Sequence, residues 1–456
     1  MTFSVKNQRV VVVGGGRSGR AAAELLAARG ARVTLADVAA TVDGADRLQA
    51  LGVALALGPH VAQLFLDADL VVLSPGVPPN QAAIAAARRA GVPVIGEIEL
   101  ASRWLAGRVI AITGTKGKST TTTLVARMLD EAGMRVTAGG NLGTALSAQV
   151  GASTADALHV VEVSSFQLES TETFHPWIAA LLNLSPDHLD RHASFEEYAA
   201  AKARIFANQT PDDWAVVNAD DPASIALARG GRARRFDFAL DASIRDGVTV
   251  EGGVIVRRDR GASAPLFPVA SVKLPGRHLL ADVLAACAVA SVAGAAPGAM
   301  QRAVEGFAGL EHALERVTEF GGVAFVNDSK ATNVAAARRA IESFQRGVVA
   351  IMGGRFKGGR FEDLADVVPG RVDAIVAIGE AAPLIHSALG AVVHVRDARS
   401  MSDAVRLGFA LAHPGGTVLL APACSSFDMF QDYAERGRAF KSEARRLDQE
   451  MGAAKH

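Results

Sequence analysis

The stretch QRVVVVGGGRSGRAAAELLAARGARVTLADV, residues 8–38, decides the fold of the chain's first part. The valines at 10–13 predict a buried strand, the alanine-rich run predicts a helix, and Asp37 ends the next strand. Between strand and helix lies a turn with three glycines: Gly14, Gly16 and Gly19. This order is typical of a doubly wound, Rossmann-like sheet that binds phosphate groups. The pattern alone leaves a nicotinamide-dependent oxidoreductase open.

Composition and charge describe an ordinary soluble globular protein of about two to four domains. Of the 456 residues, 50% are hydrophobic and 21% are charged, and Lys+Arg and Asp+Glu both number 47. The zero net charge gives no electrostatic reason to expect nucleic acid or a membrane as a partner. Two cysteines, Cys287 and Cys424, form no disulfide framework. With no signal peptide and no apolar run of roughly 18–20 residues, we expect a cytoplasmic monomer.

The α/β pattern begins again twice along the chain. RVIAITG starts a new strand and a second glycine loop at Arg108, and GVAFVNDS and GVVAIMGG repeat the pattern near the end. The stretch 232–272, rich in Arg, Asp and Gly with short alternating runs, predicts a small antiparallel insert. We therefore predict three tandem α/β domains: residues 1–107, 108–310 and 311–456.

The sequence AITGTKGKSTTTTLVARML, residues 111–129, is the strongest functional signal. A strand, a glycine loop and a helix in this order place backbone N–H groups and a helix N-terminus around phosphate oxygens. Lys118 suits the β- and γ-phosphates of ATP, and the Ser119 hydroxyl suits Mg²⁺. The strict P-loop pattern has glycine where Ile112 stands. The predicted ATP-binding loop comprises Gly114, Thr115, Lys116, Gly117, Lys118, Ser119 and Thr120.

Other polar residues follow predicted parallel strands, where ligands bind in such sheets. Glu162 ends the strand in VVEVSSFQLE, and His188 follows the strand in LLNLSPDHLDRH. Alone, Glu162 could form a structural ion pair and His188 could be an ordinary surface residue. In the last third, NDSKATN (327–333), GGRFKGG and LLAPACSSFDMF also follow strands. We expect these three loops to form a polar cap.

Taken together, these motifs resemble the Mur ligase family of cell-wall peptide synthetases. The resemblance covers nearly the whole chain: GTKGKSTTT, VVEVSSFQLE, NLSPDHLDRH, YAAAKARIF, GLEHALERV, NDSKATN and PACSSFDMFQDYAERGRAF. NDSKATN and PACSSFDMF point to the member that adds glutamate. The first domain of that member has a Rossmann-like turn that holds UDP, so the resemblance disfavours a nicotinamide enzyme.

The resemblance implies an ATP-dependent amide ligase that adds D-glutamate to UDP-N-acetylmuramoyl-L-alanine in peptidoglycan precursor synthesis. The substrate carboxylate attacks the γ-phosphate of ATP, and the glutamate amine then attacks the acyl phosphate. The UDP-substrate residues implied are Arg17, Ser18, Asp37, Ser74, Gly76, Asn141 and Ser164. The glutamate residues implied are Thr332, Lys357, Ser426, Phe427 and Tyr433.

The resemblance also implies two Mg²⁺ ions. Ser119 and Glu162 would bind one ion, and His188 and a CO₂-derived carbamate on Lys202 would bind the other. The implied catalytic residues are Lys118, His188, Lys202 and Lys330. Further implied ATP contacts are Asp282, His312 and Asp328.

Four positions on the ATP side depart from the family pattern. The family usually has asparagine where Lys116, Leu279 and Asp282 stand, and arginine where Ala313 stands. Arg277 and Arg316 are candidates to replace the missing charge. Three alternatives stay open: ligation of L-glutamate, a folylpolyglutamate-type amide ligase, and a catalytically silent nucleotide-binding homologue.

Overall fold

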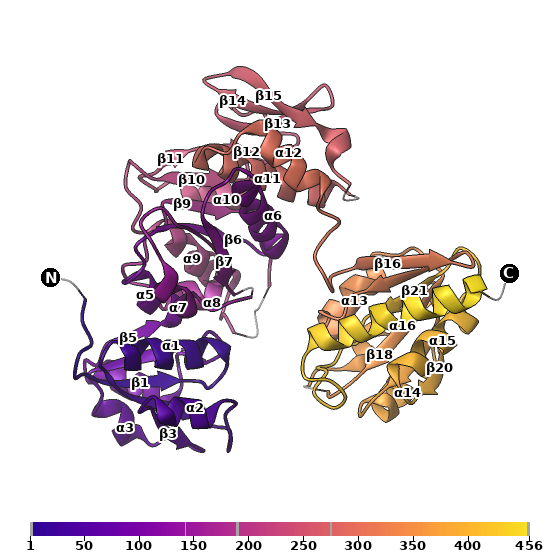
Figure 1. The fold of residues 1–456 in the computed structure, drawn as a ribbon, viewed down its shortest axis with the longest axis horizontal. Helices are drawn as coiled ribbons and strands as arrows, with labels where there is room; N and C mark the ends of the chain where they lie inside the picture. Colours follow the sequence, from indigo (N-terminus) through magenta and orange to yellow (C-terminus); the bar gives the residue numbers. More distant parts are fainter. Residues whose placement is uncertain (1–2, 142, 188–190, 274–275, 357, 454–456) are drawn as a thin grey trace. The chain divides into compact units, whose positions relative to one another are not determined.

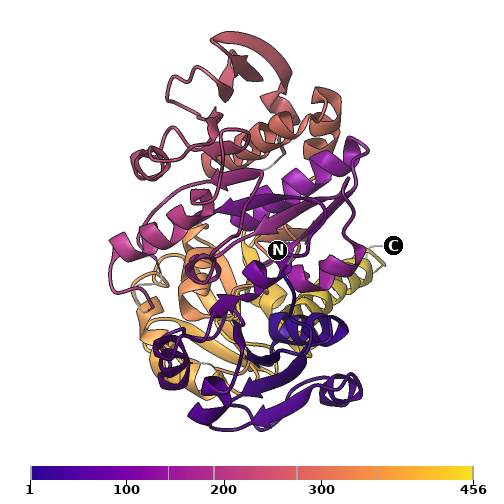
Figure 2. The ribbon, with the colours of Figure 1, turned by 90° about the vertical axis from the view of Figure 1, so that its left-hand side faces the viewer.

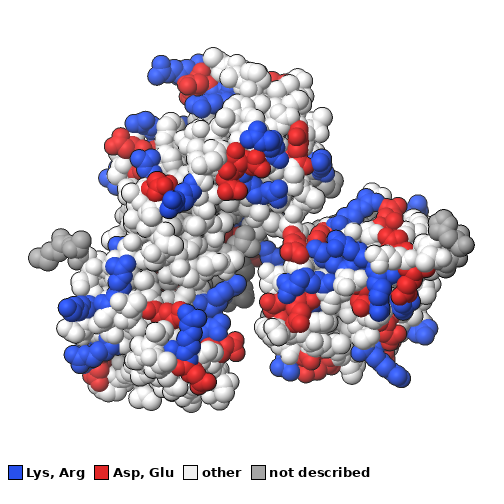
Figure 3. All heavy atoms as spheres, viewed as in Figure 1, with Lys and Arg blue, Asp and Glu red and all other residues white. Residues whose placement is uncertain are grey.

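The computed structural model describes residues 3–141, 143–187, 191–273, 276–356 and 358–453 (Figure 1). The chain forms two compact units, Met1–Phe307 and Ala308–His456. The boundaries expected near residues 107 and 310 stay predictions. Among the described residues, no helix has the length and apolar character needed to cross a bilayer. On the face drawn in Figure 3, basic and acidic side chains are interspersed on both units.

The first sheet of unit 1 has five parallel strands in the order β3-β2-β1-β4-β5. The strand order, not the strand direction, reverses between β1 and β4, and ligands of doubly wound sheets bind at the carboxyl ends of the strands beside such a point. Its strands are β1 (Arg9–Val13), β2 (Arg32–Asp37), β3 (Ala54–Leu57), β4 (Leu70–Leu73) and β5 (Val94–Gly96). Its helices are α1 (Arg17–Ala28), α2 (Ala45–Ala50), α3 (Ala62–Leu66), α4 (Ala82–Arg89) and α5 (Glu97–Ser102).

A second parallel sheet of unit 1 has the order β11-β10-β9-β6-β8-β7. Its strands are β6 (Arg108–Thr113), β7 (Val136–Gly140), β8 (Leu158–Glu162), β9 (Ile178–Leu181), β10 (Trp214–Val217) and β11 (Arg234–Arg235). The helices are α6 (Lys118–Glu131), α7 (Leu146–Gln149), α8 (Ser165–Glu169), α9 (Phe195–Ala203), α10 (Pro222–Ala228), α11 (Arg277–Ala293) and α12 (Pro297–Glu305). Helices α6, α11 and α12 pack side by side (Figures 1 and 2).

The expected insert is a four-stranded sheet with the order β12-β13-β14-β15. Its strands are β12 (Asp237–Phe238), β13 (Gly247–Glu251), β14 (Val254–Asp259) and β15 (Ala262–Pro268). Strands β13, β14 and β15 pair antiparallel, as predicted, whereas β12 pairs with β13 in parallel.

Unit 2 has one six-stranded sheet with the order β16-β17-β21-β18-β19-β20. Only β16 runs antiparallel to its neighbour. The strands are β16 (Glu315–Phe320), β17 (Val323–Asn327), β18 (Val348–Gly353), β19 (Val372–Ile378), β20 (His394–Ala398) and β21 (Thr417–Leu420). The helices are α13 (Val334–Glu342), α14 (Ala382–Leu389), α15 (Met401–Leu411) and α16 (Tyr433–Ala453).

Each unit contains apolar cores of its own. In unit 1, the first sheet buries valines and leucines on both faces, including Val12 and Leu35. In unit 2, β18 is buried along its whole length between helices on the two faces of the sheet. Strands buried on both faces have continuous hydrophobic sequences, which explains why runs such as VVAIMG identified the α/β class from sequence.

Candidate active site

The glycine loop after β6 is held against the neighbouring strand β9. Gly114 lies so close to β9 that a Cβ there would approach the Leu182 side chain to 2.9 Å, and Gly117 has a left-handed φ of +81°. Asn183 accepts from the backbone N–H of Lys116 through its Oδ1 (2.9 Å) and donates to the Lys116 carbonyl through its Nδ2 (3.1 Å). The loop is thus fixed in shape before α6 begins at Lys118.

Lys118 reaches back over this loop from the first position of α6. Its Nζ donates to the carbonyl oxygens of Gly114 (2.9 Å) and Thr115 (2.8 Å). The ammonium therefore lies at the N-terminal end of α6, where the helix dipole also favours anions. This placement agrees with the expected role in binding phosphate, which stays a prediction.

Three predicted site residues meet at the end of β8. Glu162 is buried, with 2% of its surface exposed, and its Oε2 accepts from the Ser119 hydroxyl at 2.7 Å. Its Oε1 accepts from the Asn141 side-chain amide at 2.6 Å. The hydroxyl and carboxylate predicted to bind a metal ion are therefore within direct contact of each other.

Lys202 lies on α9 and is buried, with 2% of its surface exposed. Its Nζ donates to the Gly114 carbonyl (2.9 Å) and to the Thr113 hydroxyl (3.3 Å). Lys118 and Lys202 thus share one carbonyl oxygen. Burial, and then the charge of Lys118, lower the pKa of Lys202 to about 7, and the nearby carboxylates act in the opposite direction. A large share of the amine is therefore neutral at physiological pH.

Two of the predicted residues, His188 and Lys357, lie outside the described residues. Their expected roles, in metal binding and in glutamate binding, stay predictions.

Asp282 packs directly against the nucleotide loop. A Cβ on Gly117 would lie 2.0 Å from Asp282 Oδ1, so the carboxyl group fills the space that glycine leaves. Burial raises the pKa of Asp282 to about 7. Leu279 is half-buried one turn earlier on α11. Arg277, a candidate for the missing charge, is exposed and hydrogen-bonded to both oxygens of Asp241.

The predicted UDP residues of the first sheet gather at the carboxyl edge, near the point between β1 and β4 where the strand order reverses. Asp37 accepts from the backbone N–H of Gly15 at 2.5 Å, and the Ser74 hydroxyl donates to the Gly14 carbonyl at 2.9 Å. Both side chains therefore shape the glycine turn itself. Arg17 and Gly76 are exposed at the same edge, and Ser18 is half-buried at the start of α1.

Ser164 has a local role in the structure as well. Its hydroxyl accepts from the backbone N–H of Gln167 (3.2 Å) and caps α8, and the Gln167 side chain accepts from the Ser164 N–H (2.9 Å). This capping box fixes the turn that follows β8. The expected substrate contact by Ser164 stays a prediction.

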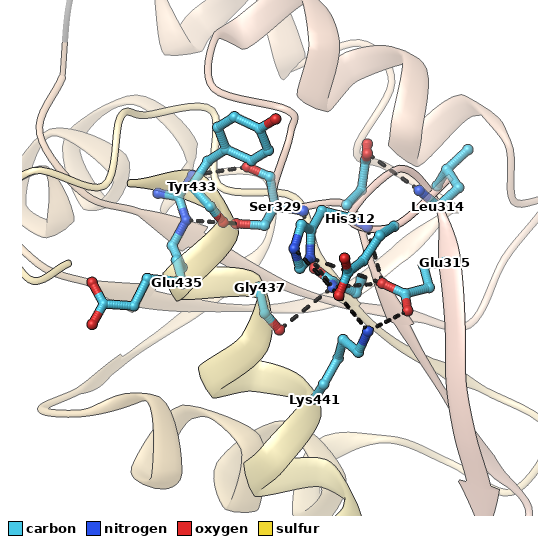
Figure 4. Close-up of polar contacts among 12 residues, drawn as sticks. His312, Leu314, Glu315, Ser329, Tyr433, Glu435, Gly437 and Lys441 are labelled. Carbon is cyan, nitrogen blue, oxygen red and sulfur yellow. Dashed lines mark hydrogen bonds and ion pairs between the residues drawn. The ribbon is translucent and has the colours of Figure 1, made fainter. Parts of the chain in front are cut away.

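In unit 2, His312 is the centre of a buried polar cluster (Figure 4). Its Nδ1 accepts from the Asn327 side-chain amide at 2.9 Å, and its backbone N–H donates to Glu315 at 2.9 Å. Lys441 donates to Glu315 (2.6 Å) and to Glu311 (2.9 Å). The two carboxylates flank the histidine as metal ligands would, but both already pair with the Lys441 ammonium, so we interpret the cluster as structural.

Asp328 and Lys330 follow β17 in the loop beside this cluster. Asp328 accepts from the backbone N–H of Leu314 at 3.3 Å, and burial raises its pKa to about 6. The Lys330 N–H donates to the His312 carbonyl at 3.0 Å. Arg316, the other candidate for the missing charge, pairs with Glu319. The expected contacts of His312 and Asp328 with ATP, and the role of Lys330, stay predictions.

Three loops that carry predicted glutamate residues are joined by backbone hydrogen bonds. The N–H of Ala423 donates to the Ala331 carbonyl at 2.9 Å, and the N–H of Gly353 donates to the Pro422 carbonyl at 2.8 Å. The loops after β17, β18 and β21 thus form one surface at the carboxyl edge of the sheet. Of the predicted residues here, Thr332 is half-buried, Ser426 is buried, and Phe427 and Tyr433 are exposed.

Family models match the two α/β sheets of unit 1 and the sheet of unit 2. The Mur ligase MurD-like N-terminal domain matches residues 8–96, the Mur ligase middle domain residues 112–290, and the Mur ligase glutamate ligase domain residues 314–424. All three matched domains are domains of one family of ligases. This chain belongs to the Mur ligase family. The fold class predicted from sequence is confirmed.

Relatives extend over nearly the full length. The chain is 46% identical over 444 residues to the UDP-N-acetylmuramoylalanine–D-glutamate ligase of Acidobacterium capsulatum, covering 96% of both chains. It is 43% identical to the enzyme of the same name from Geotalea daltonii, covering 98% of this chain and 99% of the other.

Solved structures share the fold at lower identity. The UDP-N-acetylmuramate-alanine ligase MurC of Thermotoga maritima has a TM-score of 0.58 at 19% identity, covering 97% of this chain and all of the other. MurF of Acinetobacter baumannii has a TM-score of 0.57 at 16% identity, covering 95% of this chain and 93% of the other.

Proposed function

We propose that this chain catalyses the ATP-dependent ligation of D-glutamate to UDP-N-acetylmuramoyl-L-alanine in peptidoglycan precursor synthesis. One observation carries the proposal: Lys118, Ser119, Glu162 and Lys202 meet at one sheet edge in a chain 46% identical, over nearly its full length, to an enzyme named for this reaction. The nucleotide loop supports ATP as substrate. We further propose that the protein acts as a cytoplasmic monomer and binds neither nucleic acid nor membranes.

The proposed chemistry has two steps. A carboxylate oxygen of the substrate's L-alanine attacks the γ-phosphorus of ATP, and the bond to the β-phosphate oxygen breaks, which releases ADP and leaves an acyl phosphate. The neutral amine of glutamate then attacks the acyl carbon, and phosphate leaves as the amide forms and the amine loses a proton. Lys118 stabilises negative charge on the transferred phosphoryl group, because phosphoryl transfer depends mainly on positioning and charge neutralisation.

The donor set at the end of β8 suits Mg²⁺. Ser119 and Glu162 offer a hydroxyl and a carboxylate oxygen 2.7 Å apart, and both are hard oxygen donors. The Asn141 amide orients the carboxylate from its other oxygen. A bound ion here would offset phosphate charge. A carbamate on Lys202, together with His188, is the proposed ligand set for a second ion.

A ligation assay with the full chain tests the function. Product formation and phosphate release should require ATP, UDP-N-acetylmuramoyl-L-alanine and D-glutamate together. L-glutamate should compete with D-glutamate, because the side-chain types in the proposed pocket suit both isomers. The competition should be weak, because we expect the geometry of the pocket to favour the D isomer. Turnover with L-glutamate alone would shift the proposal to that isomer. Turnover with a folate substrate would favour a folylpolyglutamate-type ligase. No turnover with any of these substrates would favour a catalytically silent homologue.

The first sheet is expected to bind the UDP substrate and not NAD(H). Its glycine turn is typical of both ligands, but the chain belongs to the Mur ligases. Calorimetry on the full chain should give a binding isotherm with UDP-N-acetylmuramoyl-L-alanine and none with NAD(H). Binding of NADH at micromolar concentration, with no response to the UDP compound, would overturn this assignment.

Asp282→Asn is expected to lower the KM for ATP, and the gain should grow with pH. Burial holds the pKa of Asp282 near 7, so the carboxyl is largely neutral below pH 7 and ionised above it. An ionised carboxyl against Gly117 opposes a polyphosphate on the same loop. The wild-type KM for ATP should therefore rise between about pH 6 and 8, while that of the asparagine variant stays flat. Parallel profiles would show that Asp282 does not titrate near the nucleotide.

A further inference from the structure

One guanidinium in unit 2 joins the ends of three adjacent strands. Arg436, in the first turn of α16, donates through Nε and Nη2 to the hydroxyl and carbonyl of Ser329, both at 3.0 Å. Its Nη1 donates to the carbonyls of Cys424 (3.1 Å) and Gly353 (3.5 Å). These residues follow or end β17, β21 and β18, which are neighbours in the sheet.

The charge on Arg436 is buried and forms no direct ion pair with any described residue. The side chain is one of the largest in the interior, with 2% exposed, and its four acceptors are a hydroxyl and three carbonyls, all uncharged. Burial lowers the pKa of Arg436 to about 10, so the group stays protonated at neutral pH. Cys424 and Asp428 act in the opposite direction on this pKa, but neither forms an ion pair with the guanidinium, and Asp428 Oδ2 accepts from the Glu380 N–H. A buried, unpaired charge is costly to fold around.

The loops tied by Arg436 are those that carry the proposed glutamate residues. Thr332 lies three residues beyond Ser329, and Ser426 lies two beyond Cys424. The Ser329 hydroxyl also donates to the Tyr433 carbonyl at 2.7 Å (Figure 4). In the loop after β21, Ala423 has a left-handed φ of 58°. This conformation is strained for alanine, so the surrounding contacts must maintain it.

A close approach at Gly354 shows how tightly the guanidinium fits. A Cβ there would lie 2.2 Å from the Ser425 carbonyl and 3.2 Å from Arg436 Nη1, so glycine at this position permits the close approach of the loop after β18 to the loop after β21. Lysine in place of Arg436 would keep the charge but could not make the forked contacts to three strand ends.

We propose that Arg436 is a positioning residue for the amino-acid substrate: it holds the three loops in register and supplies a fixed positive charge beneath them. This rests on the proposed ligation of glutamate. A dicarboxylic amino acid brings two negative charges to a surface beneath which lies a buried guanidinium that forms no direct ion pair among the described residues. In a low-dielectric interior such a charge acts over longer distances than it would in water.

The test compares Arg436→Lys and Arg436→Met in the full chain. Arg436→Met should raise the KM for D-glutamate about 20-fold or more, and Arg436→Lys about three- to tenfold, because lysine keeps the charge. The KM values for ATP and UDP-N-acetylmuramoyl-L-alanine should change by no more than about twofold. Arg438→Met is the matched control: it removes an exposed charge from the same helix and should leave all three KM values unchanged.

The outcomes separate this inference from the proposed function. A wild-type chain that makes no product from the three substrates refutes the function itself. If the wild type is active, an unchanged KM for glutamate in Arg436→Met, equal effects of Lys and Met, or parallel rises in all three KM values would overturn the inference. If Arg436→Met does not fold, Arg436→Lys carries the test, and a rise confined to glutamate supports the inference.

Discussion

Lys202→Ala is expected to nearly abolish ligation, and Lys202→Arg is expected not to restore it. The Lys202 amine is buried 2.9 Å from the carbonyl that also accepts from Lys118, and its pKa of about 7 leaves much of it neutral. A neutral amine adds to CO₂: the N–C bond forms and a proton leaves, which converts a cation into an anionic oxygen donor. An ammonium or guanidinium has no lone pair to offer a metal ion, so arginine preserves only a charge of the wrong sign.

Three measurements check this prediction. Under ¹³C-labelled bicarbonate, the wild-type chain should show a carbamate carbon signal that Lys202→Ala lacks. Acetate should partly restore turnover in the alanine variant, because a small carboxylate can occupy the vacated space. Lys273→Ala, which removes an exposed lysine from the same unit, is the control and should be fully active. A Lys202→Arg variant as active as wild type would contradict the carbamate hypothesis.

Lys118→Ala is expected to lower turnover by about 100- to 1,000-fold, equivalent to about 2.7–4 kcal/mol of transition-state stabilisation. Its ammonium lies on the glycine loop at the start of α6, where charge on the transferred phosphoryl group would develop. Single-turnover measurement at saturating ATP separates this loss from weaker nucleotide binding. Near-normal turnover would mean that the loop only connects strand and helix.

Lys118→Ala should also change the pKa of the neighbouring Lys202. The charge of Lys118 is the second cause that lowers the pKa of Lys202. Its removal should therefore raise that pKa, so the labelled carbamate should appear at higher pH in Lys118→Ala than in wild type. An unchanged pH dependence would show that burial alone sets the lysine's pKa.

Short-range patterns predicted the parts of this protein that depend on neighbours in sequence. The two strand–glycine–helix turns follow from runs such as VVVVGGG, and the rule that ligands lie at carboxyl ends of strands placed Ser119 near Glu162, which lie 2.7 Å apart. The antiparallel insert was visible in its alternating residues. These features need no knowledge of the tertiary structure.

Residues whose role depends on distant contacts were not found in this way. Asn183 hydrogen-bonds to Lys116 of the glycine loop, and Tyr198 shares a hydrogen bond with the Thr115 hydroxyl. The motifs that contain Asn183 and Tyr198 assigned them no role. Arg436 lies in the motif PACSSFDMFQDYAERGRAF, which assigned it no role. For Lys202, only the family resemblance suggested a role, because burial of a cation is set by the packing of whole elements. For Asn183, the sequence did offer one signal, because it is a polar residue just after a buried strand.

The division of the apolar cores between the two units has a consequence for equilibrium unfolding. Each described core lies wholly within Met1–Phe307 or within Ala308–His456. Chains built from several cooperative blocks depart from two-state behaviour, so we expect calorimetry to show more than one unfolding transition. A substitution in α16 changes the unfolding equilibrium of one block, and a substitution in α6 that of the other. Thermal inactivation, by contrast, reports the block that melts first.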